Sequence, residues 1–209
     1  MYKAVLFDMD GVLIDARDWH FDALNEALTP FDYQISLTDH QERFNGLSTR
    51  MKLEILSEEY DFPRSLHAIV SKVKQDRTLR IAAQKCYPNP NHLILLSRIK
   101  KAGLKTGLVT NSIRETTEYM LRSAGLLDLL DTIITNQDIK NPKPSPEGYL
   151  LACTNLGCEP DEVIVIEDGD YGIKAAEAAG CRVLKVVAPY EVNLELLIGA
   201  IPELAPGEK

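Results

Sequence analysis

In the sequence AVLFDMDGVLID, residues 4–15, four apolar residues run directly into two carboxylates that stand one residue apart. Residues 4–7 are typical of a short buried strand. Asp8 and Asp10 follow it, and a glycine comes next. In an open sheet of parallel strands, ligands bind beyond the carboxyl ends of the strands. This stretch therefore predicts a first strand that presents two acids to a ligand, although both could simply be turn residues before the glycine.

Short apolar runs and helical segments alternate through the second half of the chain. The further runs that predict strands are 104–109, 132–134, 163–166 and 183–187. The segments with helical spacing are 93–101, 115–124, 146–156 and 172–179. Alternation of this kind is typical of a parallel sheet with helices on both faces. We therefore predict an α/β fold built on a Rossmann-like parallel sheet.

The region between the first strand and residue 87 interrupts this alternation, because its apolar residues have helical spacing and no strand stands out. We predict an inserted α-helical cap over residues 16–87. The core domain would then consist of residues 1–15 and 88–209. From about Ile201 onward, proline, glycine and charged residues predict a loose tail.

Composition excludes several classes of protein. The chain has 209 residues and a net charge of −8, without a basic patch, which argues against nucleic acid as a partner. No apolar stretch reaches membrane-spanning length, and the opening residues do not resemble a secretory signal, so we expect a cytoplasmic protein that does not bind membranes. The four cysteines lack the spacing of a zinc site. A monomer is the simplest expectation.

Polar residues also follow the later predicted strands. Thr110 and Asn111 end the second run and can donate hydrogen bonds to phosphate oxygens, or could instead cap the next helix. Lys143 lies between two prolines, which suits a fixed cation beside a phosphate, although a solvated loop lysine is the alternative. Glu167 and Asp168 end another buried run. Together with Asp8, Asp168 could meet the demand of Mg²⁺ for oxygen ligands.

Taken in order, these motifs resemble those of a known family. DxDG, Thr-Asn, KPxP and EDxxxGIxAAxAAG are similar to the four motifs of the haloacid dehalogenase superfamily, in the branch of β-phosphoglucomutase and small sugar phosphatases. The resemblance covers nearly the whole chain, including an insertion after the first strand. It implies a Mg²⁺-dependent enzyme that forms an aspartyl-phosphate.

The resemblance also implies roles for single residues. Asp8 would be the nucleophile and a metal ligand, and Asp10 the general acid and base, with its backbone carbonyl on the metal. Asp168 would complete the protein ligands, and Glu167 would hold a metal-bound water. The residues expected around the transferring phosphoryl group are Thr110, Asn111 and Lys143, of which Thr110 and Lys143 would also be catalytic.

The cap residues are expected to bind the leaving group of the substrate. The segment FNGLSTR, residues 44–50, resembles the glycine-centred substrate loop of this branch, which points to Gly46 and Arg50. His20 and Lys74 are the other candidates. Arg50 and Lys74 could equally be solvated helix residues, and His20 could be a histidine packed at the base of the cap.

Three functions follow for comparison. The first is a phosphatase that hydrolyses a small phosphorylated metabolite, expected to be a sugar phosphate. The second is a phosphosugar mutase, which would return the phosphoryl group to another hydroxyl. The third is an idle binding module that retains the fold. An intact set of like-charged acids argues against the idle module, because gathering such charges costs stability.

Overall fold

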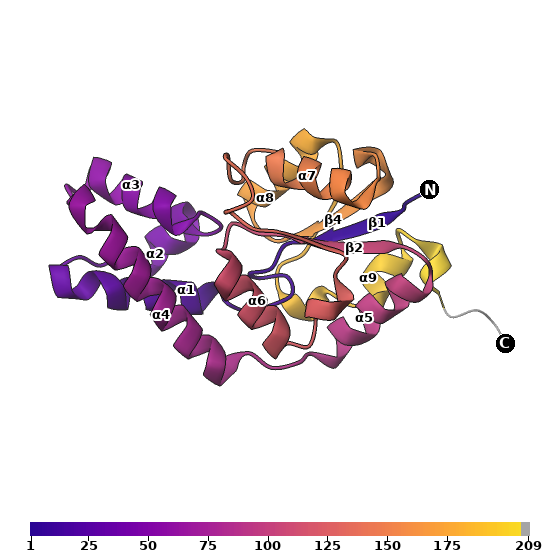
Figure 1. Ribbon diagram of the computed structural model, residues 1–209, viewed down its shortest axis with the longest axis horizontal. Helices are drawn as coiled ribbons and strands as arrows, with labels where there is room; N and C mark the ends of the chain where they lie inside the picture. Colours follow the sequence, from indigo (N-terminus) through magenta and orange to yellow (C-terminus); the bar gives the residue numbers. More distant parts are fainter. Residues whose placement is uncertain (206–209) are drawn as a thin grey trace.

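The sheet is the centre of the molecule. The computed structural model describes residues 1–205, in which five strands form one parallel sheet in the order β3-β2-β1-β4-β5 (Figure 1). The strands are β1 (Ala4–Phe7), β2 (Lys105–Val109), β3 (Thr132–Ile134), β4 (Val163–Glu167) and β5 (Arg182–Lys185). The central β1 pairs with β2 on one side and β4 on the other, so the residues that follow these three strands share one edge.

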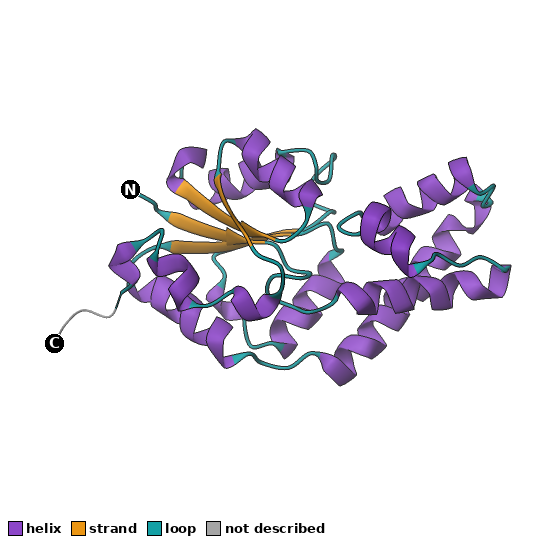
Figure 2. Ribbon diagram, turned by 180° about the vertical axis from the view of Figure 1, so that it is seen from behind, coloured by secondary structure: helices purple, strands orange, loops and turns teal. Residues whose placement is uncertain are grey.

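Helices cover both faces of the sheet, as Figures 1 and 2 show. One face carries α5 (Pro90–Lys101), α6 (Arg114–Ser123) and α9 (Leu194–Ile198), and the other carries α7 (Glu147–Leu156) and α8 (Asp170–Ala179). Successive side chains of a strand point to opposite faces. Val5 and Phe7 accordingly pack in the cluster beneath α5 and α6, whereas Ala4 and Leu6 pack against α7 and α8. This burial on both faces explains why β1 is continuously apolar.

A helical segment leaves the sheet between β1 and β2. It contains α1 (Arg17–Leu28), α2 (Leu37–Asp39), α3 (Thr49–Glu59) and α4 (His67–Lys85), with a π-helical turn η2 (His40–Phe44) before α3. Its helices pack on an apolar cluster of their own, which includes Leu24, Phe44, Leu53 and Phe62. The segment stands beside the sheet at the end where the strands finish (Figure 2). It is therefore placed to cover that edge.

Short 3₁₀ turns complete the elements. They are η1 (Thr29–Phe31), η3 (Arg64–Leu66), η4 (Leu127–Leu129), η5 (Pro160–Glu162), η6 (Pro189–Glu191) and η7 (Pro202–Leu204). No helix within residues 1–205 has the length and apolar character needed to cross a membrane.

The predicted α/β fold with an inserted helical segment is confirmed, and all five predicted strands form. The predicted loose tail is wrong for residues 201–205. Ile201 and Leu204 are only 3% and 1% exposed, because they pack into the core cluster that α5 and α9 share. Residues 206–209 of the predicted tail lie outside the described part. The boundaries 16–87 of the cap stay a prediction.

Candidate active site

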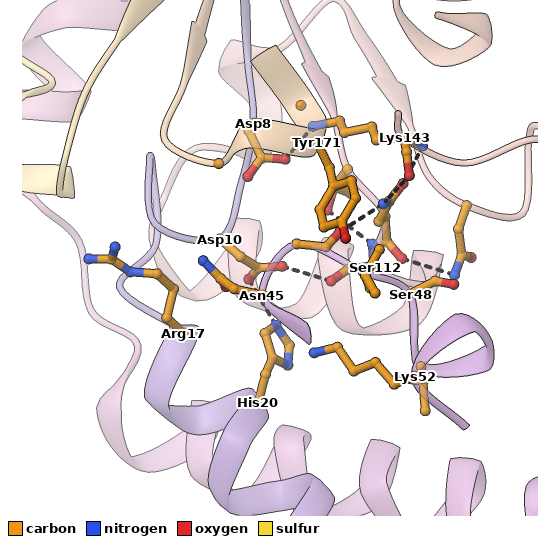
Figure 3. A pocket seen from close by; sticks show the side chains of 18 of the residues that line it. Asp8, Asp10, Arg17, His20, Asn45, Ser48, Lys52, Ser112, Lys143 and Tyr171 are labelled. Atoms are coloured by element: carbon orange, nitrogen blue, oxygen red, sulfur yellow. Dashed lines mark hydrogen bonds and ion pairs between the residues drawn. The ribbon is translucent and has the colours of Figure 1, made fainter. Parts of the chain in front are cut away.

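Lys143 joins the ends of two strands. Its Nζ donates to Asp8 Oδ1 and to Glu167 Oε1, at 2.6 Å in both cases. Asp8 follows β1, Glu167 ends β4, and Lys143 lies in the loop before α7. All three side chains are largely buried. The structure thus brings together three residues that are far apart in the sequence, and Figure 3 shows Asp8 and Lys143 facing each other.

The charges of this group depend on each other. Burial raises the pKa of Asp8 well above its usual range, and the ammonium of Lys143 opposes that rise. Burial alone would lower the pKa of Lys143, but Asp8 and Glu167 outweigh it, so the net pKa is raised. Lys143 is therefore a permanent cation, and it is the main source of compensation for two buried carboxylates.

An acidic cluster at the same edge suits a divalent cation. Carboxylate oxygens of Asp8, Glu167 and Asp168 lie within 4.8 Å of one another. Burial, then Glu167, raises the pKa of Asp168 to about 6, although Arg17 lies 3.6 Å away. Gly11 follows Asp10 with a φ of 94°, and a Cβ there would collide with the Asp168 carboxylate. The glycine of DxDG is thus required by the close approach of this acid.

Glu167 is engaged by the protein itself. Its Oε1 accepts from Lys143 and from Tyr149 Oη at 2.7 Å, and its Oε2 accepts from the backbone N–H of Asp168 at 3.1 Å. In contrast, no hydrogen bond within residues 1–205 uses Asp8 Oδ2 or either carboxylate oxygen of Asp168. Carboxylate oxygens are the protein ligands that Mg²⁺ usually takes. Asp8 and Asp168 therefore fit direct ligation, whereas Glu167 holds Lys143 in place.

Gly172→Ala should disrupt this arrangement. A Cβ at Gly172, in the first turn of α8, would collide with the carboxylate of Glu167. Displacing a buried, hydrogen-bonded acid is expected to lower the free energy of unfolding by about 3 kcal/mol. Urea denaturation would measure the loss. Gly169→Ala is the matched control: a Cβ there meets no atom within 4 Å, so a loss below about 1 kcal/mol is expected. Equal losses in both variants would contradict the account.

Asp10 is held by a chain of hydrogen-bonding groups. Ser112 Oγ donates to its Oδ2 at 2.8 Å, and His20 Nε2 lies 3.0 Å from its Oδ1. Lys74 Nζ lies 2.9 Å from His20 Nδ1, and because it can only donate, the ring proton of a neutral His20 lies on Nε2, the nitrogen nearer to Asp10. Burial would raise the pKa of Asp10, but His20, Ser112 and Lys74 outweigh it and lower it. Asp10 is therefore a carboxylate in this arrangement.

Thr110 and Asn111 serve different purposes. The Thr110 hydroxyl accepts from the Ser112 N–H at 3.1 Å, so its own proton remains available to a ligand. The Asn111 side chain is already engaged: its Oδ1 accepts from the Lys143 N–H at 3.0 Å, and its Nδ2 donates to the Gly46 carbonyl at 2.8 Å. Asn111 thus connects the Lys143 loop to the helical segment, and its role as a phosphate ligand stays a prediction.

These groups line one cavity of about 230 Å³ between the strand ends and the helical segment. All the residues predicted for catalysis, phosphate, substrate and metal binding line it: Asp8, Asp10, His20, Gly46, Arg50, Lys74, Thr110, Asn111, Lys143, Glu167 and Asp168. Arg50 is exposed at its surface. Asp170 also follows β4, but it is not among the lining residues, and its Oδ1 lies 3.5 Å from Lys185 Nζ at the surface.

Lys52 also lines the cavity, although its side chain is only 5% exposed. Figure 3 shows it extending from α3 toward His20. Burial, then the nearby charge of Lys74, lowers the pKa of Lys52 from its usual 10.5 to about 7. Burial and Lys52 likewise lower the pKa of His40 to about 4, so His40 is neutral at pH 7. Lys52 and Lys74 are consequently the cations of the helical side that lie deep in the cavity.

Lys52→Met should stabilise the protein in the absence of ligand. Folded protein releases the Lys52 proton above pH about 7, whereas the unfolded chain keeps it up to about 10.5, so this group makes stability rise with pH across that window. Below pH about 7, Lys52 is protonated in the folded protein, and its full destabilising effect on the fold is present. We expect the variant to exceed the parent by on the order of 2 kcal/mol at pH 6, with the gain shrinking toward pH 10. Urea denaturation at several pH values, with exposed Lys72→Met as control, measures it; a destabilised Lys52→Met at pH 6 would contradict it.

The family of this chain is shown by a match of its sequence to a family profile. The sequence profile of haloacid dehalogenase-like hydrolases matches residues 5–186, which include every residue of the site. The chain belongs to the haloacid dehalogenase-like hydrolase family. The predicted family and the prediction of an enzyme of this hydrolase type are therefore confirmed.

Relatives in this family are named as phosphatases. The phosphorylated carbohydrates phosphatase of Thermotoga maritima is 31% identical over 208 residues, covering 99% of this chain and 95% of the relative. Hexitol phosphatase A of Escherichia coli is 30% identical over 195 residues, covering 90% and 84%. The crystal structure of β-phosphoglucomutase from Clostridium difficile has a TM-score of 0.84 at 23% identity, covering 98% and 97% of the two chains. At that identity the structural likeness shows the fold alone.

Several lining residues of this haloacid dehalogenase-like hydrolase were not predicted from its sequence. Ser112 follows two predicted phosphate ligands, and its hydroxyl was the available signal. Arg17, Lys52 and Tyr171 gave no such signal, because a charged or aromatic residue in a helix is usually at the surface or in the core. Tyr149, which contacts Glu167, belongs to the apolar pattern of its helix.

Proposed function

We propose that the chain is a Mg²⁺-dependent phosphatase that hydrolyses a small phosphorylated metabolite, in particular a sugar phosphate, through a phosphorylated Asp8. The observation that carries the proposal is the placement of Asp8 within one cavity beside the Lys143 ammonium, at 2.6 Å, and the carboxylate of Asp168. A carboxylate in such a position can act as a nucleophile because its charge, and that of the phosphate, are compensated.

The names of the relatives support this substrate class. One acts on phosphorylated carbohydrates, another on hexitol phosphates, and a third from Escherichia coli, 27% identical, is named a fructose-1-phosphate phosphatase. They share the need to hold a phosphoryl group while releasing a polyhydroxylated alcohol. We carry this class over to the present chain as part of the proposal.

In the first half-reaction, an oxygen of Asp8 attacks phosphorus and the bond from phosphorus to the ester oxygen breaks. Asp10, in its protonated form, gives its proton to the departing alkoxide. Its carboxylate is in contact with His20, which offers a path for that proton to be supplied. Lys143 balances the negative charge of Asp8, and the hydroxyl of Thr110 can donate a hydrogen bond to a phosphoryl oxygen.

In the second half-reaction, Asp10 takes a proton from water, the water oxygen attacks phosphorus, and the bond to Asp8 breaks to release inorganic phosphate. The carboxylate form of Asp10 that Ser112 and His20 favour suits this step. Mg²⁺, held by Asp8, Asp168 and the Asp10 carbonyl, would supply positive charge to the phosphoryl oxygens.

The helical segment of residues 16–87 acts in this proposal as a cap. The hydrogen bond between Asn111 and the Gly46 carbonyl, and the contact of His20 with Asp10, join the cap to the catalytic edge. Closing the cap would exclude bulk water and expose the leaving group to His20, Lys74 and Arg50. We further expect the enzyme to act as a monomer in the cytoplasm.

Phosphate release tests the function directly. Purified protein with Mg²⁺ is incubated with a panel of sugar and polyol phosphates, and inorganic phosphate is measured with and without EDTA. We expect release from at least one panel member and its loss in EDTA. An isomerised sugar phosphate without phosphate release would identify a mutase instead. Absence of both products across the panel would remove the catalytic proposal and favour the idle binding module.

A further inference from the structure

Lys52 differs from Lys143 and Lys74, the other two deep lysines of the cavity, in its contacts within residues 1–205. Lys143 is bonded to Asp8 and Glu167, and Lys74 Nζ lies at hydrogen-bond distance from His20. For Lys52 Nζ, the hydrogen bonds and ion pairs of residues 1–205 include no partner. The Lys52 side chain is only 5% exposed but lines the cavity, so its ammonium is poorly hydrated there and remains available to a ligand.

The charges that line the cavity are divided between its two sides. The four lining carboxylates, Asp8, Asp10, Glu167 and Asp168, all follow or end core strands. The lining cations other than Lys143 all come from the helical segment: Arg17, Arg50, Lys52 and Lys74. The helical side of the cavity is therefore positive where the leaving group of a substrate would lie.

The two deep lysines of this side repel each other. Lys74 lowers the pKa of Lys52, and the carboxylate that opposes this effect is Asp10, which is already bonded to Ser112 and lies beside His20. A second negative group close to Lys52 would offset the repulsion from Lys74 and raise the pKa of Lys52, so that Lys52 stays protonated. A neutral hydroxyl would not reduce the repulsion between Lys52 and Lys74, and it would not raise the pKa of Lys52.

We propose that Lys52 is a specificity-determining residue that binds a second anionic group, a carboxylate or a second phosphate, on the leaving part of the substrate. The inference rests on the proposed function, because it assumes that the scissile phosphate lies at Asp8. It narrows the substrate class from sugar phosphates in general to phosphorylated sugar acids or sugar bisphosphates. Lys52 Nζ would donate charge-assisted hydrogen bonds to that group.

A matched set of ligands tests the inference without turnover. The set is sorbitol 6-phosphate, 6-phosphogluconate and sorbitol 1,6-bisphosphate, which share an open six-carbon chain and differ at the far end in carrying a hydroxyl, a carboxylate or a phosphate. Binding is measured by calorimetry with Mg²⁺, using Asp8→Asn protein to prevent hydrolysis. We expect at least one anionic member to bind at least about tenfold more tightly than sorbitol 6-phosphate. The stronger of the two identifies the anionic group.

Variants then assign the preference to Lys52. Adding Lys52→Met to the Asp8→Asn protein should reduce the preference to within about twofold, since the charge-assisted bonds are lost. Adding Lys72→Met, an exposed lysine of the same helical segment, should leave it unchanged. Equal binding of all three ligands by the parent, or a preference that survives Lys52→Met, overturns the inference.

Phosphate release from the same three ligands by the unmodified enzyme separates this result from the proposed function. Release without any preference for an anion would overturn the inference and leave the phosphatase standing. A Lys52-dependent preference without release from these or the panel esters would overturn the phosphatase and leave the anion site standing.

Discussion

Asp8→Asn should lose phosphate release on the order of ten-thousand-fold or more while remaining folded. An amide cannot attack phosphorus to form the acyl phosphate, so the proposed intermediate cannot form on residue 8. The fold should persist because the amide oxygen can still accept from Lys143, which keeps its second bond to Glu167. Burial already raises the pKa of Asp8, so removing its charge spares a desolvation cost.

Steady-state phosphate release and urea denaturation of the same preparation check this prediction. Asp15→Asn is the matched control, because Asp15 is an exposed acid of the same segment that does not line the cavity. It should keep full activity. Loss of a nucleophile lowers the rate far more than about a hundredfold. If Asp8→Asn retained more than about a hundredth of the parent rate, Asp8 would therefore not be the nucleophile.

Lys143→Met should have the largest effect on stability. It leaves Asp8 and Glu167 as neighbouring buried acids without their shared cation, and breaking a buried pair in this way costs about 3 to 5 kcal/mol. Without Lys143, Asp8 would keep a proton that the unfolded chain releases above pH about 4, so the variant should become less stable, relative to the parent, as pH rises from there. The rate of phosphate release by Lys143→Met should also fall, because the cation beside Asp8 is lost.

Urea denaturation in EDTA across pH measures this loss without compensation from a metal. Lys140→Met is the control, since Lys140 is an exposed lysine of the same loop that contacts other residues through its backbone. A Lys143→Met protein as stable as the control at neutral pH would show that the ion pairs of Lys143 do not hold the strand ends together.

The sequence predicted the sheet well because its signal is local. β1 and β4 are buried on both faces, so each appears as an uninterrupted apolar run that ends in acids. The edge strand β5 was predicted one residue late at its start, since Arg182 and Lys185 are exposed and obscure the pattern. The tail was misjudged because residues 201–209 are rich in proline, glycine and charge, and only the packed core shows where Ile201 and Leu204 fit.

The residues of the candidate site were predictable where acids recur at the ends of strands. They were less predictable where the helical segment meets the core. Nothing in the sequence places Lys52 or His40 within the cavity, because side-chain direction depends on how α3 and η2 pack. The role of Asn111 as a link to Gly46 also depends on that packing. Resemblance to the family supplied the residues of the chemistry, whereas the structure supplies their partners.

The most direct test of the account is where the phosphoryl group resides during turnover. The enzyme is mixed with an active phosphate ester and Mg²⁺, quenched in acid within one turnover, digested, and analysed by mass spectrometry. The account predicts one added phosphoryl group on the peptide that contains Asp8, absent from Asp8→Asn. A phosphoryl group found on another residue, or continued turnover with none trapped on Asp8, would contradict it.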